Sequence, residues 1–298
     1  MASKHILHML TPLKHMSPFD VNMALDAGFD AVLPYVDVGI AEVTSLVQDA
    51  IFSRPPNAGV DTGIFIAGKN AALALDMLDA AKKAMVPPFR VSVFADPAGS
   101  FTTAAAVVAK VEKSLKTKFG RELKDTRIAI FGATGVVGFC TAVLAAREGA
   151  KVALVGHDGP QRVSEVASEI RARFELDVAA DDGSSEAKKK SILAASEVVL
   201  SAAKAGVEVI SKEMLDEAGG LLLAADVNAV PPAGIAGLGI SDDGVPLAGT
   251  TAVGIGPLAI GNVKYKTEFG LFKKLIEAEK PVIFDFQDAF SLAREIVT

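Results

Sequence analysis

The residues with the clearest chemical meaning are three glycines, Gly132, Gly135 and Gly138, spaced three apart. They follow an apolar run at 128–131 and precede a segment of helical character at 139–147. In such a unit the first glycine permits a tight turn, the second lets a pyrophosphate approach, and the third lets the helix pack closely on the strand. The free N–H groups at the start of the helix favour phosphates. The stretch therefore predicts a dinucleotide site at Gly132, Ala133, Thr134, Gly135, Val136, Val137 and Gly138, although a purely structural turn has the same spacing.

Polar residues follow the next expected strand, at 152–155, and bear on which dinucleotide binds. The carboxylate of Asp158 could accept hydrogen bonds from the ribose hydroxyls of NAD, whereas His157 and Arg162 could bind the 2′-phosphate of NADP. A solvated turn with Asp158 as a helix cap is the alternative. Ala203 and Lys204 follow a further expected strand, at 197–201, where such a fold meets its cofactor. We expect NAD or NADP, and these residues are compatible with the use of both.

A second group of polar residues lies in the first 115 residues, each cluster after an expected strand. Ligands of open α/β sheets bind beyond the carboxyl ends of the strands. Such residues could bind a substrate, or could only cap the following helices, as Ser, Thr and Asp commonly do. The candidates are Lys14, Asp20, Asp96, Ser100, Thr102 and Thr103.

Composition limits the classes of function. The chain has 298 residues, 50% of them hydrophobic, and a net charge of −6, which disfavours nucleic-acid and acidic-membrane partners. The four histidines have no metal-ligand spacing, so we expect no metal. The one cysteine, Cys140, fits a small buried side chain. No signal peptide and no run of membrane-spanning length is visible, which predicts a cytoplasmic protein.

Strand and helix patterns alternate along the chain, and this predicts an α/β protein with mostly parallel sheets. We expect two domains: a substrate domain at 1–115, completed by 270–298, and a Rossmann-type nucleotide domain at 116–269. The expected strands are 5–10, 30–35, 62–67, 91–94, 128–131, 152–155, 176–179, 197–201 and 221–225. The expected helices are 17–27, 40–49, 71–84, 104–115, 139–147, 161–174, 185–193 and 285–296.

Several long motifs together resemble the bacterial methylene-tetrahydromethanopterin dehydrogenases, and most closely their NAD(P)-dependent branch. They cover nearly the whole chain. They are TPLKHMSPFDVNMA, FADPAGSFTTAAA, GATGVVG, VGHDG, DVNAVPPAGI and GIGPLAIGNVKYK.

The resemblance implies a pterin-binding α/β domain, a Rossmann-type domain and a homo-oligomer. It implies that the methylene carbon between N5 and N10 of the reduced pterin gives a hydride to C4 of the nicotinamide. This is a step in the oxidation of one-carbon units at the formaldehyde level. It assigns an active-site lysine to Lys264, and it brings Asp226 and Asn228, with Ala203 and Lys204, near the nicotinamide. Such a reaction needs mainly the alignment of two rings, so no strong general base is expected.

Two other functions remain open from sequence. A methylene-tetrahydrofolate dehydrogenase would use the same hydride chemistry on another carrier. A non-catalytic NAD(P)-sensing protein could use the same scaffold, since fold alone does not define function. A comparison of turnover with the two carriers separates these alternatives.

Overall fold

The computed structural model describes residues 4–298 and divides into two compact units, each with a sheet of its own. Of the described residues, unit 1 comprises 4–102 together with 265–292, and unit 2 comprises 103–264 together with 293–298. The divisions fall inside three helices, where we expected boundaries at 115 and 270. Residues 293–298, expected with the first domain, belong to unit 2.

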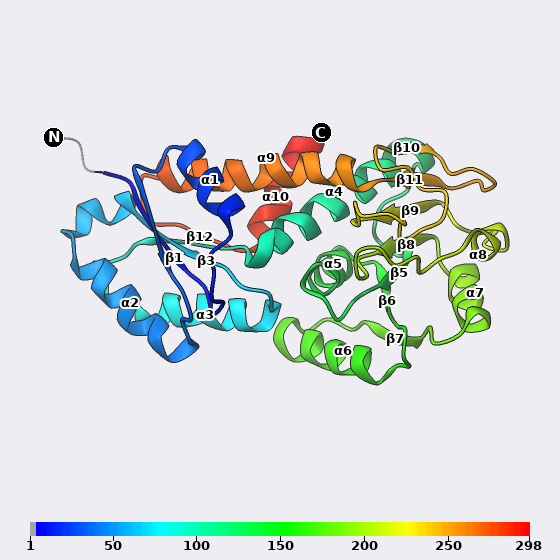
Figure 1. Ribbon diagram of the computed structural model, residues 1–298, viewed down its shortest axis with the longest axis horizontal. Coiled ribbons are helices and arrows are strands. Elements are labelled where there is room, and N and C mark those ends of the chain that lie inside the picture. The colour runs from blue at the N-terminus through cyan, green and yellow to red at the C-terminus, as the bar shows by residue number, and fades with distance from the viewer. Residues whose placement is uncertain (1–3) are drawn as a thin grey trace. The chain divides into compact units, whose positions relative to one another are not determined.

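Unit 1 is built on a five-stranded parallel sheet with the order β12-β4-β3-β1-β2 (Figure 1). Its strands are β1 (Ile6–Leu10), β2 (Ala31–Tyr35), β3 (Thr62–Ile66), β4 (Ser92–Ala95) and β12 (Ile283–Phe284). Its helices are α1 (Pro18–Ala27), α2 (Ile40–Phe52) and α3 (Ala71–Ala84), with parts of α4 (Ser100–Phe119), α9 (Pro257–Ile276) and α10 (Phe286–Val297). Two short 3-10 turns, Pro56–Asp61 and Pro97–Gly99, precede β3 and α4 respectively.

The core of unit 1 is aromatic on one face of the sheet. Phe272 of α9 lies with its ring centroid 5.3 Å from Phe65 of β3 and 5.2 Å from Phe94 of β4, and all three side chains are fully buried. Edge-to-face and tilted ring pairs of this kind add to the free energy gained by burial. The contact explains why α9, far along the chain, completes this unit.

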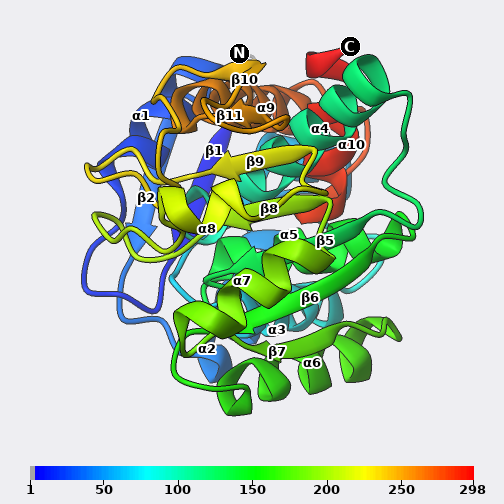
Figure 2. The same cartoon turned by 90° about the vertical axis from the view of Figure 1, so that its right-hand side faces the viewer.

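Unit 2 has a seven-stranded sheet with the order β10-β11-β9-β8-β5-β6-β7, visible in Figure 2. All neighbours are parallel except β10 and β11. Without β10, this is the 3-2-1-4-5-6 order of a Rossmann fold that begins at β5. The strands are β5 (Arg127–Phe131), β6 (Lys151–Gly156), β7 (Ala179–Asp182), β8 (Val198–Ser201), β9 (Leu223–Asp226), β10 (Asp243–Pro246) and β11 (Val253–Ile255). The helices are α5 (Val136–Arg147), α6 (Gln161–Phe174), α7 (Glu186–Ala195) and α8 (Lys212–Asp216), with the remaining parts of α4, α9 and α10.

Most predicted elements are present, and the differences have physical reasons. The prediction of a strand at 176–179 was wrong, because the strand, β7, forms at Ala179–Asp182. It is an edge strand with a single neighbour, so it can include the polar residues Asp181 and Asp182. The helix expected from 104 begins at Ser100, because the buried carboxylate of Asp96 accepts hydrogen bonds from its first turn. Helices α8 and α9 and strands β10, β11 and β12 were not predicted, and all of them except the 20-residue α9 are only two to five residues long.

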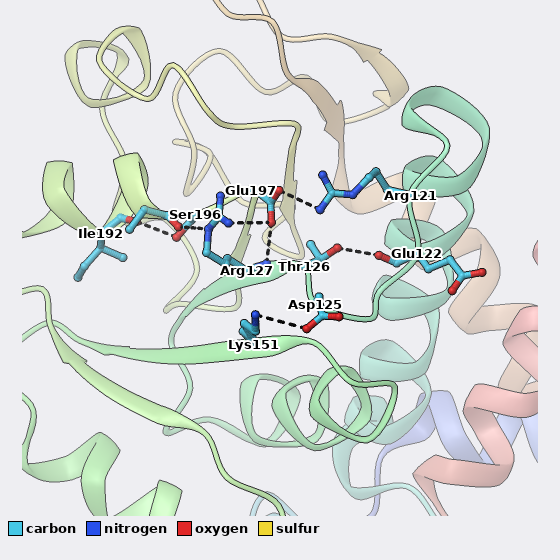
Figure 3. Close-up of polar contacts among 10 residues, drawn as sticks. Arg121, Glu122, Asp125, Thr126, Arg127, Lys151, Ile192, Ser196 and Glu197 are labelled. Carbon is cyan, nitrogen blue, oxygen red and sulfur yellow. Dashed lines mark hydrogen bonds and ion pairs between the residues drawn. The ribbon is translucent and has the colours of Figure 1, made fainter.

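The amino ends of β5 and β8 are joined by an ion-pair cluster centred on Glu197 (Figure 3). Its carboxylate accepts hydrogen bonds from the backbone N–H of Arg127 and the Nη2 of Arg121, each at 3.0 Å, and its side chain is 9% exposed. Desolvation alone would raise the pKa of Glu197, but these hydrogen bonds and the two guanidinium charges outweigh it and lower the pKa. The ionised form is therefore the one that holds the two strands.

The Glu197 cluster gives a stability prediction. Glu197→Gln should lower the free energy of unfolding at neutral pH by about 1–3 kcal/mol, because a charged acceptor of two donors is lost. Because the folded pKa is lowered, the difference from the native protein should shrink as the pH falls below the ordinary Glu pKa of about 4.3. Urea unfolding at a series of pH values measures both effects.

The matched control is Asp125→Asn. Asp125 pairs with Lys151 at 3.3 Å in the same region, but the two side chains are 66% and 67% exposed. An exposed pair contributes at most about 1 kcal/mol. Equal losses for the two variants would show that burial of Glu197 has no special role.

Candidate functional site

The largest cluster of predicted site residues lines a cavity of about 540 Å³ at the carboxyl ends of β5, β6 and β8 in unit 2. Nine of the predicted residues contribute to it. They are Gly132, Ala133, Thr134, Gly135, His157, Asp158, Arg162, Ala203 and Lys204.

The glycine turn forms one wall of this cavity and depends on close approaches of the backbone. Gly132 has a φ of +81°, and a Cβ there would lie 2.3 Å from the carbonyl oxygen of Ala202. A Cβ at Gly138 would lie 2.6 Å from the carbonyl oxygen of Gly132. Neither position can accept a side chain, because real Cβ atoms do not come this close to backbone atoms.

Gly135 differs from the other two glycines. Its φ is −85°, which any residue adopts, and the nearest atom to an added Cβ is the carbonyl oxygen of Gly132 at an ordinary 3.4 Å. It lines the cavity and is the N-cap of α5. The protein itself does not require glycine here, whereas a phosphate approaching the N–H groups of α5 would.

The end of β6 carries the charged wall of the cavity. Asp158 lies 3.4 Å from Nη1 of Arg162 and 3.8 Å from Nδ1 of His157. Desolvation alone would raise the pKa of Asp158, but the hydrogen bond from Arg162 and the electrostatic influence of His157 and Arg162 lower it. The cavity therefore has an ionised carboxylate and a guanidinium within reach of each other, the groups that suit a ribose hydroxyl and a phosphate respectively.

Sequence reasoning missed several lining residues. Lys189 of α7 donates from Nζ to the carbonyl oxygen of Val209 at 2.9 Å, and Glu208 lies nearby on the lining. Lys189 stands in a run of three lysines at 188–190, so the sequence had no signal to single it out. The other lining residues that were not predicted are Phe131, Val155, Gly156, Val163, Ala202, Val207 and Val209.

Asp226 and Asn228 do not line this cavity. Asp226 is fully buried, and its carboxylate accepts hydrogen bonds from the N–H groups of Gly234 at 2.6 Å and Asn228 at 3.0 Å. Asn228 in turn bonds the backbone of Val230 through both ends of its amide. Desolvation raises the pKa of Asp226 in spite of these bonds. The two residues hold the loop after β9 and line a smaller cavity of about 190 Å³.

Val136, Val137 and Gly138 lie in the first turn of α5 and not on the cavity lining. The first N–H groups of a helix have no partner within it, so this turn can donate hydrogen bonds from its backbone. Their predicted role as phosphate donors stays a prediction.

The predicted substrate residues of unit 1 follow the carboxyl ends of two strands. Lys14 is exposed in the loop after β1, and Asp20 is buried in the first turn of α1, where its N–H donates to Ser17 Oγ at 3.4 Å. After β4, Asp96 accepts from the N–H of Phe101 at 2.8 Å and from the hydroxyl of Thr102 at 2.6 Å. Asp96 and Thr102 thus form the cap of α4.

Ser100 and Thr103 flank this cap in the first turn of α4, the former buried and the latter half-buried. Lys264 is half-buried in α9, between the buried Val263 and the exposed Tyr265.

Within the described residues, 4–298, no group of three or more His, Cys, Asp or Glu side chains is arranged to hold a metal ion. None of the helices in this part of the chain combines the length and apolar character that a membrane crossing requires.

The strand order, the glycine turn and the cavity beside it define unit 2 as a dinucleotide-binding Rossmann-type unit. The whole chain is similar in fold to a quinate dehydrogenase from Corynebacterium glutamicum solved in complex with NAD. The TM-score is 0.55 and the identity 15%, with 97% of this chain and 98% of that one covered.

Sequence comparison identifies the family. A family model described as methylene-tetrahydromethanopterin dehydrogenase, N-terminal, matches residues 18–98. The chain is 56% identical, over 99% of both chains, to an NAD(P)-dependent methylenetetrahydromethanopterin dehydrogenase of Methylorubrum extorquens. It is 32% identical, again over 99% of both chains, to the bifunctional protein MdtA of the same organism. The protein therefore belongs to the methylene-tetrahydromethanopterin dehydrogenase family, as the sequence motifs predicted.

Gly135, unlike Gly132 and Gly138, has room for a Cβ in the folded protein, and this difference gives a binding prediction. Gly135→Ala should fold normally but weaken the binding of NAD and NADP about tenfold or more, because overpacking a tight contact costs about 1–3 kcal/mol. Isothermal titration calorimetry measures the affinity, and thermal unfolding tests the fold.

Gly219→Ala is the matched control, since a Cβ at Gly219 meets no atom within 4 Å and the residue lies away from the cavity. Gly219→Ala should leave affinity unchanged. Unaltered affinity in Gly135→Ala would mean that no phosphate approaches this residue.

Proposed function

We propose that the protein oxidises methylene-tetrahydromethanopterin to methenyl-tetrahydromethanopterin, with NAD⁺ or NADP⁺ as the hydride acceptor. The observation that carries the proposal is that 56% identity to a relative named for this reaction extends over 99% of the chain, and so over both units. If the two proteins had only dinucleotide binding in common, similarity confined to unit 2 would be enough. The similarity extends over unit 1 as well, which supports a shared substrate.

The cavity of unit 2 fits the dinucleotide. Gly132 and Gly138 allow the turn, Gly135 leaves room beside the N-terminus of α5, and the N–H groups of Val136, Val137 and Gly138 bind the pyrophosphate. Ala133, Thr134, Ala203 and Lys204 complete the lining. When bound, the oxidised nicotinamide supplies the acceptor for the hydride.

The end of β6 supports the use of both dinucleotides. Asp158 would accept hydrogen bonds from the ribose hydroxyls of NAD, and Arg162 and His157 would hold the 2′-phosphate of NADP. The ion pair between Asp158 and Arg162, both about half exposed, allows either partner to turn to a ligand at small cost.

The substrate side is assigned to the carboxyl edge of the sheet in unit 1. Lys14, Asp20, Ser100 and Thr103 would contact the pterin, and Asp96 with Thr102 would hold the loop between β4 and α4 in place. Asp226 and Asn228 would act in the same way on the loop after β9, so we assign them to positioning and not to contact with the nicotinamide.

The hydride transfer does not require a side chain that acts as a general acid or base. The methylene carbon is flanked by two nitrogens, whose lone pairs stabilise the cation left when the hydride departs, and no proton is transferred. The residues must therefore bind and orient two rings and exclude water. Lys264 would bind the pterin and adjust the charge near its reacting ring.

A homo-oligomeric state and a cytoplasmic location remain predictions from the sequence.

A spectrophotometric assay tests the proposal. The formation of NADH or NADPH is followed by its absorbance at roughly 340 nm. The protein should reduce NAD⁺ and NADP⁺ with methylene-tetrahydromethanopterin, and much more slowly with methylene-tetrahydrofolate, because a site built for one carrier disfavours another. Faster turnover of the folate would make the protein a methylene-tetrahydrofolate dehydrogenase. Dinucleotide binding without turnover of either carrier would make it a sensor.

Lys264→Ala should lower turnover about 100-fold, the loss expected when a reacting ring is misplaced. The affinity for NAD and NADP, measured by calorimetry, should not change. Lys266→Ala is the control, since Lys266 is an exposed lysine two residues further along α9. A Lys264→Ala variant that retains full turnover would remove Lys264 from the mechanism.

A further inference from the structure

Three aromatic side chains of unit 1 form a continuous surface that the mechanism above does not use. Phe19 meets Tyr265 edge to face, with ring centroids 6.4 Å apart and planes at 82°. Tyr265 lies parallel to Phe269 one helical turn further along α9, with centroids 6.5 Å apart and planes at 7°. We call these three residues the aromatic platform.

Two of the three platform side chains are exposed and the third, Phe269, is half-buried, whereas the aromatic core of the same unit is fully buried. Phe19 and Tyr265 are each 47% exposed, whereas Phe65, Phe94 and Phe272 are fully buried. Aromatic rings carry much of the binding energy where they contact ligands, and a contiguous exposed group of them marks a binding surface more often than a single exposed residue does.

The position of the platform indicates what it binds. Phe19 lies in the first turn of α1, which follows the carboxyl end of β1, and it directly precedes the buried Asp20. The carboxyl edge is where open α/β sheets bind small ligands. Tyr265 directly follows Lys264 in α9. Two separate segments of unit 1 thus bring aromatic rings to the edge at which a ligand is expected.

The same sheet offers a comparison at its other edge. Phe52, the last residue of α2, packs edge to face on Phe89 with centroids 5.3 Å apart, and it is 55% exposed. Both residues precede a strand, Phe52 before β3 and Phe89 before β4, so they lie at the amino edge. This pair is the comparison for the platform, because it is exposed but lies at the edge where no small ligand is expected.

We propose that the platform of Phe19, Tyr265 and Phe269 packs against a planar ring of the reduced pterin substrate and so contributes to its affinity and orientation. The proposal rests on the pterin-dependent function proposed above, and it adds residues that were not among the predicted site residues. Stacking and edge-to-face contacts suit a flat heterocycle such as the pterin.

Tryptophan fluorescence tests binding without turnover. The chain has no tryptophan, so Tyr265→Trp places its only one in the platform. Titration with methenyl-tetrahydromethanopterin, without dinucleotide, should quench the emission with saturation, and the Phe19→Ala change in the same background should weaken the apparent affinity. Phe52→Trp, with its tryptophan at the amino edge, should show no saturable quenching. Equal responses at the two positions, or none at Tyr265→Trp, would overturn the proposal.

Kinetics give a second readout. Phe19→Ala and Tyr265→Ala should raise the KM for the pterin about three- to tenfold, the range that an aromatic contact contributes, with the KM for NAD⁺ or NADP⁺ unchanged. Tyr265→Phe should restore the native KM, and Phe52→Ala should not alter it. Unchanged pterin KM in both alanine variants would overturn the proposal.

The platform could instead bind a second copy of this chain, and gel filtration with light scattering tests this alternative. A lower molecular mass for Tyr265→Ala than for the native protein would assign the platform to self-association and overturn the proposal, and an unchanged mass supports it. Failure of the proposed function has a different signature, because the native protein itself would then turn over no methylene pterin.

Discussion

The contact of backbone on backbone at the glycine turn is the constraint on which unit 2 depends. Gly132 approaches the peptide between Ala202 and Ala203 so closely that a Cβ would lie within 2.5 Å of three of its atoms. This contact ties the turn after β5 to the turn after β8, its neighbour in the sheet. Gly138 then brings α5 against the same turn. The position of the helix N-terminus, and so of its N–H groups, follows from two positions that only glycine can occupy.

Charges in unit 2 are divided between the two edges of its sheet according to burial. At the amino edge Glu197 is buried and bonded to two arginine residues, an arrangement that stabilises the fold. At the carboxyl edge the pair of Asp158 and Arg162 is exposed, so each charge remains available for other partners. The same kinds of residues thus stabilise the fold at one edge and, in the function proposed above, select the ligand at the other. In unit 1, too, exposed aromatic residues lie at both edges, and only those at the carboxyl edge meet the condition for a ligand site.

The sequence predicted much of this architecture because its local signals are strong. Helix α3 was predicted over its observed range, since Asn70 caps it, and so was α6, in which Val163 and Ile170 are spaced to face the sheet. The glycine turn was predicted from its spacing and its setting between strand and helix. The alternation of strands and helices identified parallel sheets, and the motifs identified the family.

What the sequence could not predict depends on contacts between distant residues. Strand β12 is two residues long and exists because it pairs with β4, some 190 positions earlier. Asp226 was expected near the nicotinamide because of the family resemblance, and only the structure shows that its carboxylate accepts hydrogen bonds from the N–H groups of its own loop. The aromatic platform joins Phe19 to residues of α9, a contact that no local pattern indicates.

In the proposed reaction the hydride passes directly from the methylene carbon of a reduced pterin to a nicotinamide. The most direct test uses methylene-tetrahydromethanopterin with deuterium on the methylene carbon and analyses the reduced nucleotide by NMR and mass spectrometry. Direct transfer should place one deuterium per molecule at C4 of NADH or NADPH, on a single face of the ring. Reduced nucleotide without deuterium, or none formed, would contradict it.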